Sequence, residues 1–150
     1  MTLSRIRKEL DCNSKHPLPG IRLFQDPCYP GDIYHLLASI VGPVNTPYED
    51  CVFFLSIHLP QDYPFKPPSV LFLTPIYSAS IDQRGRNCLD ILKDNWTPAL
   101  TIPKVLLCLQ SLLSDPNPDD PLEAEIAQLY KQNPAEFERI AREKAHLHAW

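Results

Sequence analysis

The spacing of apolar residues along the chain predicts a helix followed by a set of strands. Leu3, Ile6 and Leu10 recur at helical spacing, so an amphipathic helix that faces a core with these residues is expected over residues 2 to about 15. Runs rich in β-branched and large apolar residues come next, and proline, glycine and asparagine separate them. These runs predict four strands, at 20–25, 32–41, 51–59 and 69–74.

The second half of the chain is expected to be irregular first and helical afterwards. Residues 74–99 hold a polar turn and then a cysteine, Cys88. Thr101 is a good helix cap and Pro103 suits a first turn, which predicts a helix over about 102 to 113.

Two further helices are expected to finish the chain, over about 122 to 131 and from a cap at Asn133-Pro134 onward. One sheet with helices before and after it is an α+β pattern. A length of 150 residues suits a single domain over residues 1–150.

Composition and charge exclude several classes of function. The net charge of -4 and the lack of a basic stripe argue against nucleic-acid binding. No apolar run approaches the length of a membrane span, and the charged, amphipathic start does not resemble a secretory signal. We therefore expect neither nucleic acid nor a membrane as a partner.

The cysteines indicate a reducing compartment, which we expect to be the cytoplasm or the nucleus. Their number is odd and no two have Cys-x-x-Cys spacing, which argues against a disulfide framework and against a metal site. Cys51 and Cys108 fall within a predicted strand and a predicted helix, so we expect both in the core. His58 is expected to make a cross-strand or loop contact. The five cysteines are Cys12, Cys28, Cys51, Cys88 and Cys108.

Cys88 is the candidate for chemistry, because it directly follows a polar turn and should be partly exposed. Arg84 and Arg86 are close in sequence, and positive charge favours the thiolate form of a cysteine. The alternative is a small buried hydrophobic residue. No histidine lies near Cys88 in the sequence, so the pattern does not indicate a cysteine protease with a histidine base.

Two further features have either a binding or a structural interpretation. Residues 63–68 contain three prolines, and this rigid loop presents Phe65 and Lys66 either to a partner or over the core. An aromatic residue before proline, as at Tyr63-Pro64, is a reasonable place for a cis peptide bond. The basic face of the first helix, which includes Arg5 and Lys8, is either a solvated face or a docking face.

With these motifs in place, the chain resembles the ubiquitin-conjugating enzymes, most closely the small single-domain class that works with RING-type ligases. The resemblance covers essentially the whole chain. It implies an N-terminal helix, a four-stranded antiparallel meander sheet, an active-site stretch and C-terminal helices. It rests on five blocks in the family's order: Val52-Phe53-Phe54-Leu55, Asp62-Tyr63-Pro64-Phe65-Lys66-Pro67-Pro68, Asn87-Cys88-Leu89-Asp90-Ile91-Leu92, Trp96-Thr97-Pro98-Ala99-Leu100-Thr101 and Asp115-Pro116-Asn117-Pro118-Asp119-Asp120-Pro121-Leu122.

The resemblance implies an activity and a set of partners. Members of this family accept the C-terminus of ubiquitin from an activating enzyme as a thioester and pass it to a lysine amine. The implied partners are therefore ubiquitin, ubiquitin-activating enzyme, RING-type ligases and the lysines of substrate proteins. No cofactor is implied, since ATP is used by the activating enzyme.

Site residues carry over from the resemblance by position. Cys88 matches the acceptor thiol, and Asp120 matches the residue that orients or deprotonates the incoming lysine. Asp90 and Asn117 match residues that line the same groove. Leu107 and Ser111 match the helix face on which ubiquitin folds back. The residues that match the ligase-docking surface are Arg5, Lys8, Pro64, Phe65, Lys66, Thr97, Pro98 and Ala99.

The chain departs from the family where His-Pro-Asn is usual, because Ser78-Ala79-Ser80 stands there. Ser80 is in register with an asparagine whose amide supports the active-site loop and, it is proposed, the oxyanion of the transition state, so the resemblance makes Ser80 the candidate for this catalytic role. Losing one such donor lowers a rate by about 100- to 1,000-fold. Gln25 also replaces a small serine that contacts a second ubiquitin in close relatives. The Gln25 change argues against processive chain building. The loss of His-Pro-Asn supports an alternative function, a non-catalytic protein of the same fold that engages ligases or the activating enzyme as a scaffold or competitor.

Overall fold

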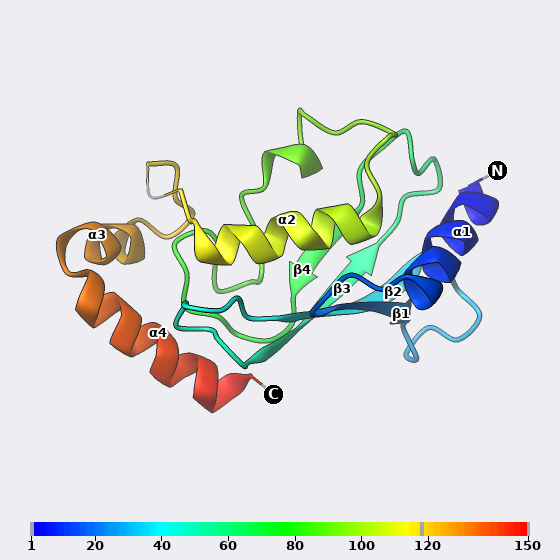
Figure 1. Ribbon diagram of the computed structural model, residues 1–150. Helices are drawn as coiled ribbons and strands as arrows, with labels where there is room; N and C mark the ends of the chain where they lie inside the picture. The colour runs from blue at the N-terminus through cyan, green and yellow to red at the C-terminus, as the bar shows by residue number, and fades with distance from the viewer. Residues whose placement is uncertain (1, 118, 150) are drawn as a thin grey trace.

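The computed structural model describes residues 2–117 and 119–149. Over this part of the chain a helix is followed by four strands, a short 3-10 helix and three helices (Figure 1), which confirms the α+β order predicted from the sequence. The elements are α1 Thr2–Lys15, β1 Ile21–Gln25, β2 His35–Val41, β3 Val52–His58, β4 Ser69–Phe72, η1 Asp90–Leu92, α2 Ile102–Ser114, α3 Ala124–Gln132 and α4 Pro134–His148.

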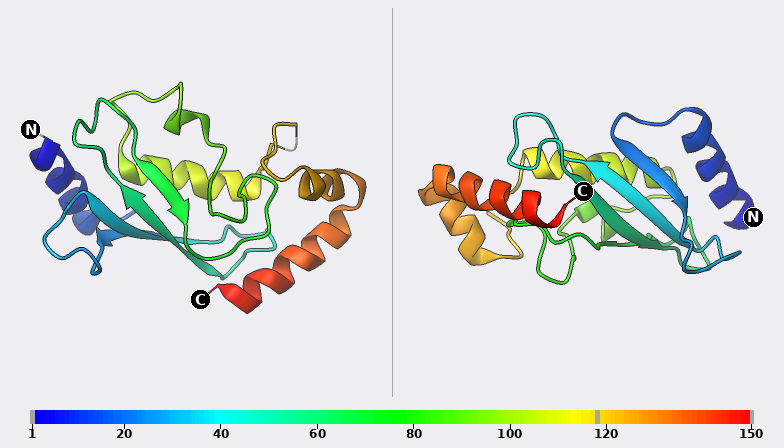
Figure 2. Two further views of the ribbon diagram at one scale, coloured as in Figure 1. Left: turned by 180° about the vertical axis from the view of Figure 1, so that it is seen from behind. Right: turned by 90° about the horizontal axis from the view of Figure 1, so that it is seen from below.

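The strands form an antiparallel meander in the order β1-β2-β3-β4. Their register places buried apolar residues opposite one another in a row across the sheet: Leu23 faces Ala38, Ala38 faces Leu55, and Leu55 faces Phe72. Because side chains alternate along a strand, this row makes one face of the sheet apolar. Helix α2 crosses that face and completes the core (Figures 1 and 2).

The remaining helices lie at opposite ends of the molecule, with α1 at one end and α3 and α4 at the other (Figure 1). Phe137 of α4 stacks on Tyr77 at a ring-centroid distance of 5.7 Å and meets Tyr130 of α3 edge-to-face at 5.1 Å. These aromatic contacts attach the C-terminal helices to the segment that leads to Cys88.

Several local predictions are confirmed. The Thr101 hydroxyl accepts the Lys104 N–H at 3.3 Å and caps α2. The Asn133 side chain likewise accepts the Glu136 N–H at 3.2 Å and caps α4. The Tyr63-Pro64 peptide bond is cis. Cys51 is buried, and His58 stacks across the strand pair on His35.

All four strands are shorter than predicted, and in β2 and β4 a side chain takes over hydrogen bonding at the shortened end. Strand β2 begins at His35 rather than at residue 32, since the Asp32 carboxylate accepts the Tyr34 N–H and contacts the His35 ring, which forms a turn. Strand β4 ends at Phe72 rather than at residue 74. There the Thr74 hydroxyl, and not a backbone carbonyl, accepts the Phe54 N–H at 2.9 Å.

The predicted apolar face of α1 is partly wrong. Leu3 is 41% exposed, whereas Glu9 and Asn13 join Ile6 on the buried side of the helix. The buried stripe is displaced because the Glu9 carboxylate finds hydrogen-bond partners in the interior. Cys108, expected in the core, is only half-buried. Among the described helices, none is both long and apolar enough to span a membrane.

Candidate active site

Cys88 is presented to solvent from a backbone that is held on both sides. On one side, Asn87 pairs with Ile81 in an isolated antiparallel bridge. The Asn87 side-chain amide also donates to the Val70 carbonyl at 3.1 Å. On the other side of Cys88, the Leu89 N–H donates to the Asn87 side-chain oxygen at 3.0 Å. The thiol itself is half-exposed, as predicted from its place after a polar turn. A thiol in this position can be reached by a large acyl donor while its backbone stays in place.

The turn before Cys88 is organised by the Asp82 carboxylate. It accepts the backbone N–H groups of Arg84 and Arg86, both at 2.9 Å, and the Arg86 Nε–H at 2.7 Å. Burial opposes ionisation of Asp82, but the hydrogen bonds from Arg86 and Arg84 outweigh it and lower the pKa of this carboxyl. The positive charge of Arg86 is therefore balanced by the Asp82 carboxylate. Arg86 should for this reason influence Cys88 less than its place in the sequence suggests.

Residues 78–80 form a buried segment that links the cysteine region to the acidic loop. The Ser78 hydroxyl accepts the Ser80 N–H at 3.1 Å, and the Ala79 carbonyl accepts the N–H groups of Leu122 and Glu123 at 2.9 and 3.2 Å. Ser80 is 0% exposed, and its hydroxyl has no hydrogen-bond partner among the described residues. This side chain therefore points into the protein and not toward solvent.

The acidic loop keeps its carboxylates at the surface. The Asn117 side chain accepts the Asp119 N–H at 3.2 Å, and the Asn117 carbonyl accepts the Asp120 N–H at 3.3 Å. Asp119 forms an exposed ion pair with Lys131 of α3 at 2.7 Å. Asp120 stays exposed. Asn117 thus shapes the backbone that presents Asp120, which lies two residues before the Ala79–Leu122 hydrogen bond.

Asp90 is also exposed, but its side chain has a structural contact. Its carboxylate accepts the Asn95 amide at 2.8 Å, and its carbonyl accepts the N–H groups of Lys93 and Asn95. Asp90 therefore closes the turn that follows Cys88, which includes η1.

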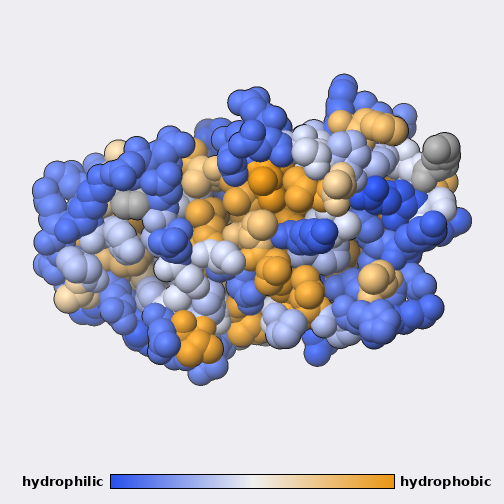
Figure 3. All heavy atoms as spheres, turned by 45° about the horizontal axis from the view of Figure 1, so that its top comes forward, coloured by the Kyte–Doolittle hydropathy of each residue, from blue (hydrophilic) through white to orange (hydrophobic). Residues whose placement is uncertain are grey.

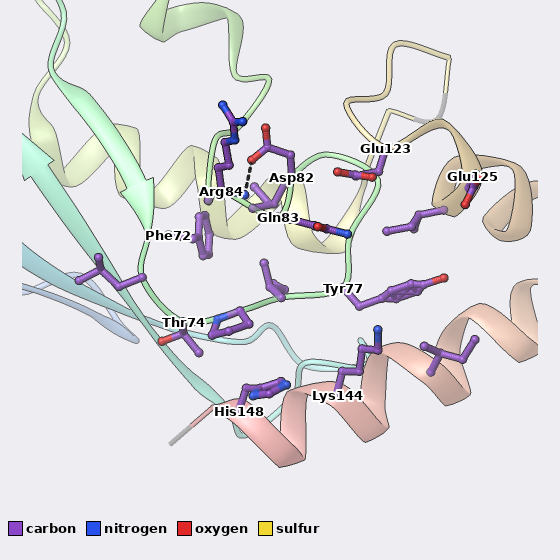
Figure 4. A pocket seen from close by; sticks show the side chains of 17 residues that line it. Phe72, Thr74, Tyr77, Asp82, Gln83, Arg84, Glu123, Glu125, Lys144 and His148 are labelled. Atoms are coloured by element: carbon purple, nitrogen blue, oxygen red, sulfur yellow. Dashed lines mark hydrogen bonds between the residues drawn. The ribbon is translucent and has the colours of Figure 1, made fainter.

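An open pocket of about 820 Å³ lies between the turn before Cys88 and the C-terminal helices α3 and α4 (Figure 4). Gln83 of that turn and Tyr77 line it, with Glu123 at the start of α3 and Lys144 on α4 on different sides. The Lys144 ammonium group lies 5.0 Å from the centroid of the Tyr77 ring. Within the described residues there is no cluster of three or more His, Cys, Asp or Glu side chains suited to a metal ion.

Six of the eight predicted ligase-docking residues lie on two adjacent loops, and one of the six, Pro64, is half-buried. Phe65 is 75% exposed, and Lys66, Thr97, Pro98 and Ala99 are also exposed. We refer to these five residues as the two-loop surface. The Trp96 indole N–H donates to the Pro64 carbonyl at 2.9 Å and holds the loops side by side.

The two predicted docking residues on α1 differ in their surroundings. Lys8 is exposed. Arg5 is half-buried, and its guanidinium donates to the Pro98 and Leu100 carbonyls at 2.8 and 2.9 Å. Arg5 therefore supports the second loop from beneath, a role that the basic character of the helix face did not indicate.

The face of α2 predicted to contact ubiquitin is accessible. Leu107 and Ser111 are exposed and lie one turn apart, so they share a side of the helix. Figure 3 shows apolar side chains gathered near the centre of the view onto this side of the molecule.

Sequence reasoning did not identify Glu9, Tyr63 and Asn87 as residues whose side chains hold the loops and the backbone of this site in place. Asn87 had a weak signal, its place directly before the cysteine. Glu9 had none, because a carboxylate within a charged helix normally faces solvent.

Comparisons with known proteins agree with this geometry. Residues 5–145 match the family model described as ubiquitin-conjugating enzyme. Among solved structures, the E2 domain of a ubiquitin conjugating enzyme from Toxoplasma gondii is 38% identical in sequence. That match covers 100% of both chains, with a TM-score of 0.92.

Proposed function

The chain belongs to the ubiquitin-conjugating enzyme family, and from this premise we propose that Cys88 carries ubiquitin as a thioester between an activating enzyme and a lysine amine. The observation that carries the proposal is the half-exposed Cys88 thiol on a backbone held by Asn87. In this family the transfer is a thioester exchange followed by aminolysis, and both steps need a nucleophile of this kind at the surface.

Each of the two steps forms one bond to the ubiquitin carbonyl carbon and breaks another. The Cys88 sulfur attacks the carbonyl carbon of the activating enzyme's thioester, a new C–S bond forms, and the activating enzyme's thiolate leaves. A neutral lysine amine then attacks the same carbon, an amide bond forms, and the C–S bond to Cys88 breaks. Because an ammonium ion cannot attack, the exposed Asp120 carboxylate orients the amine or accepts its proton.

The ligase step is assigned to the two-loop surface. Phe65 of this surface is a large apolar side chain left 75% exposed, and aromatic side chains of this kind dominate many protein interfaces. Leu107 and Ser111 of α2 are assigned to ubiquitin when it folds back before transfer. Both assignments rest on the family resemblance together with the exposure of these side chains.

A second candidate function is a non-catalytic protein that engages ligases or the activating enzyme. One observation favours it: the Ser80 hydroxyl, in register with the family's asparagine, is completely buried and offers no donor at the surface. A chain of this kind would occupy partners without completing transfer.

A charging assay separates the two candidates. The chain is incubated with activating enzyme, ATP and ubiquitin, and adducts are resolved on a non-reducing gel. Cys88→Ala is compared with Cys12→Ala, which alters another exposed cysteine. A reducible adduct in the parent and in Cys12→Ala, but not in Cys88→Ala, is expected for the enzyme.

Free lysine is then added to the charged chain. Loss of the adduct with release of a lysine conjugate is the expected result. No adduct with a folded parent chain contradicts the enzymatic proposal and leaves the non-catalytic one.

A further inference from the structure

A buried carboxylate lies beneath the two-loop surface. Glu9 of α1 is 6% exposed and accepts three hydrogen bonds. The donors are the Tyr63 hydroxyl at 2.5 Å, the Ile102 backbone N–H at 2.6 Å and the Arg5 Nε–H at 3.0 Å. A buried charge is strongly unfavourable unless donors of this kind surround it, so the set of contacts acts as a unit.

Two of the three donors, Tyr63 and Ile102, belong to the segments that carry the two-loop surface, and the third, Arg5, lies on α1 with Glu9. Tyr63 precedes Pro64 and Phe65 on the first loop. Ile102 is the first residue of α2 and directly follows the second loop. Arg5 extends the unit further, because its Nη2 also donates to the Pro98 and Leu100 carbonyls. One carboxylate therefore sets the position of both loops relative to α1.

The donor at Tyr63 is in the protonated form that this geometry requires. Burial, together with the hydrogen bond and charge of Glu9, raises the pKa of the Tyr63 hydroxyl well above its usual range. The hydroxyl thus keeps its proton and donates to Glu9 over the whole neutral range.

We propose that Glu9 and Tyr63 are positioning residues for the RING-type ligase: they hold Phe65 and Pro98 at the relative placement that the ligase recognises. This inference rests on the ligase-dependent function proposed above. Neither residue can touch a ligase, since Tyr63 is 0% exposed and Glu9 nearly so. Any effect of their removal on ligase affinity must pass through the loops.

The test compares Tyr63→Phe, Glu9→Gln and a matched control. Tyr63→Phe removes only the hydroxyl that reaches Glu9. Asp11→Asn is the control, because Asp11 lies on the same helix and also has an i,i+4 ion pair, with Lys15 at 3.1 Å, but both side chains are exposed. The probe is the purified RING domain that, among a panel of such domains, most accelerates discharge of the charged parent chain to free lysine.

Two quantities are measured at a temperature where all variants are folded. Calorimetry gives the Kd of each uncharged chain for the RING domain, and a discharge assay gives the rate with and without that domain. Tyr63→Phe and Glu9→Gln are expected to raise the Kd by about threefold to thirtyfold, while Asp11→Asn leaves it unchanged. The unstimulated discharge rate is expected to stay within about twofold of the parent, and saturating RING domain is expected to restore the stimulated rate.

Equal Kd values for Tyr63→Phe, Asp11→Asn and the parent overturn the inference while leaving the proposed function intact. If Glu9→Gln does not fold, Tyr63→Phe decides the result by itself. If the parent binds none of the RING domains and none accelerates its discharge, the proposed ligase step fails, and the inference fails with it. A fall in the unstimulated rate equal to the fall in the stimulated rate also overturns it, because the defect then lies in the chemistry and not in docking.

Discussion

The Ala79 carbonyl oxygen accepts the backbone N–H of Leu122 at 2.9 Å. This hydrogen bond joins the segment before the active-site turn to the end of the acidic loop. Ser80, the next residue, is enclosed, and its hydroxyl has no partner among the residues that the structure describes. The position that resembles the family's asparagine is thus occupied by an inward-facing side chain.

Ser80→Ala is expected to leave the free energy of unfolding unchanged or to raise it by up to about 2 kcal/mol, because it removes a buried hydroxyl that pays for desolvation without a hydrogen bond. Urea unfolding measures this. The rate of discharge to free lysine is expected to stay at the parent value. A tenfold or larger fall in that rate would instead support the sequence-based prediction that Ser80 acts in transfer.

Asp120→Ala is expected to slow discharge to free lysine by about 100-fold or more, because the amine loses its acceptor. Charging by the activating enzyme involves no amine and should be unchanged. The deficit should narrow as pH rises toward the lysine pKa near about 10, where the neutral amine becomes abundant. Asp119→Ala is the control, since Asp119 is paired with Lys131. Equal losses in both variants would contradict a specific role for Asp120.

Asp82→Asn is expected to lower the free energy of unfolding at pH 7 by about 0.5–1.5 kcal/mol, because the charge-assisted contact with Arg86 is lost. The pKa of Asp82 is lowered in the folded state, so its stabilisation is present above the pKa of the unfolded chain. It is lost as pH falls through the carboxyl range toward the folded-state pKa.

The difference between parent and Asp82→Asn should therefore shrink below about pH 4. Urea unfolding at pH 7 and at lower pH measures it, with Asp11→Asn as the exposed control. A difference that is the same at both pH values would rule out this account.

Gly85→Ala is expected to destabilise the fold by more than about 2 kcal/mol, as measured by urea unfolding. Gly85 has φ +86, and an added Cβ would lie 2.2 Å from the Phe72 carbonyl oxygen. Gly31→Ala separates the two causes, because Gly31 has φ +80 with nothing within 4 Å of an added Cβ. It should lose only about 1–2 kcal/mol, the backbone contribution. Equal losses would show that the contact with β4 is unimportant.

Local patterns in the sequence were sufficient for the element order and for the capped starts of α2 and α4. Hydrophobic spacing and cap residues act over a few positions, so one chain displays them directly. The strand ends at His35 and Phe72 were missed, since they depend on where the side chains of Asp32 and Thr74 find partners.

The α+β fold, the family and the choice of Cys88 as the candidate thiol could all be predicted from the sequence. These follow from motifs that each lie within a short stretch of chain. Tertiary structure alone decided that Glu9 is buried and that Ser80 faces inward. Glu9 lies 54 residues from Tyr63 and 93 from Ile102. Contacts of that range depend on how the elements pack, because burial and hydrogen bonding are settled by neighbours in space.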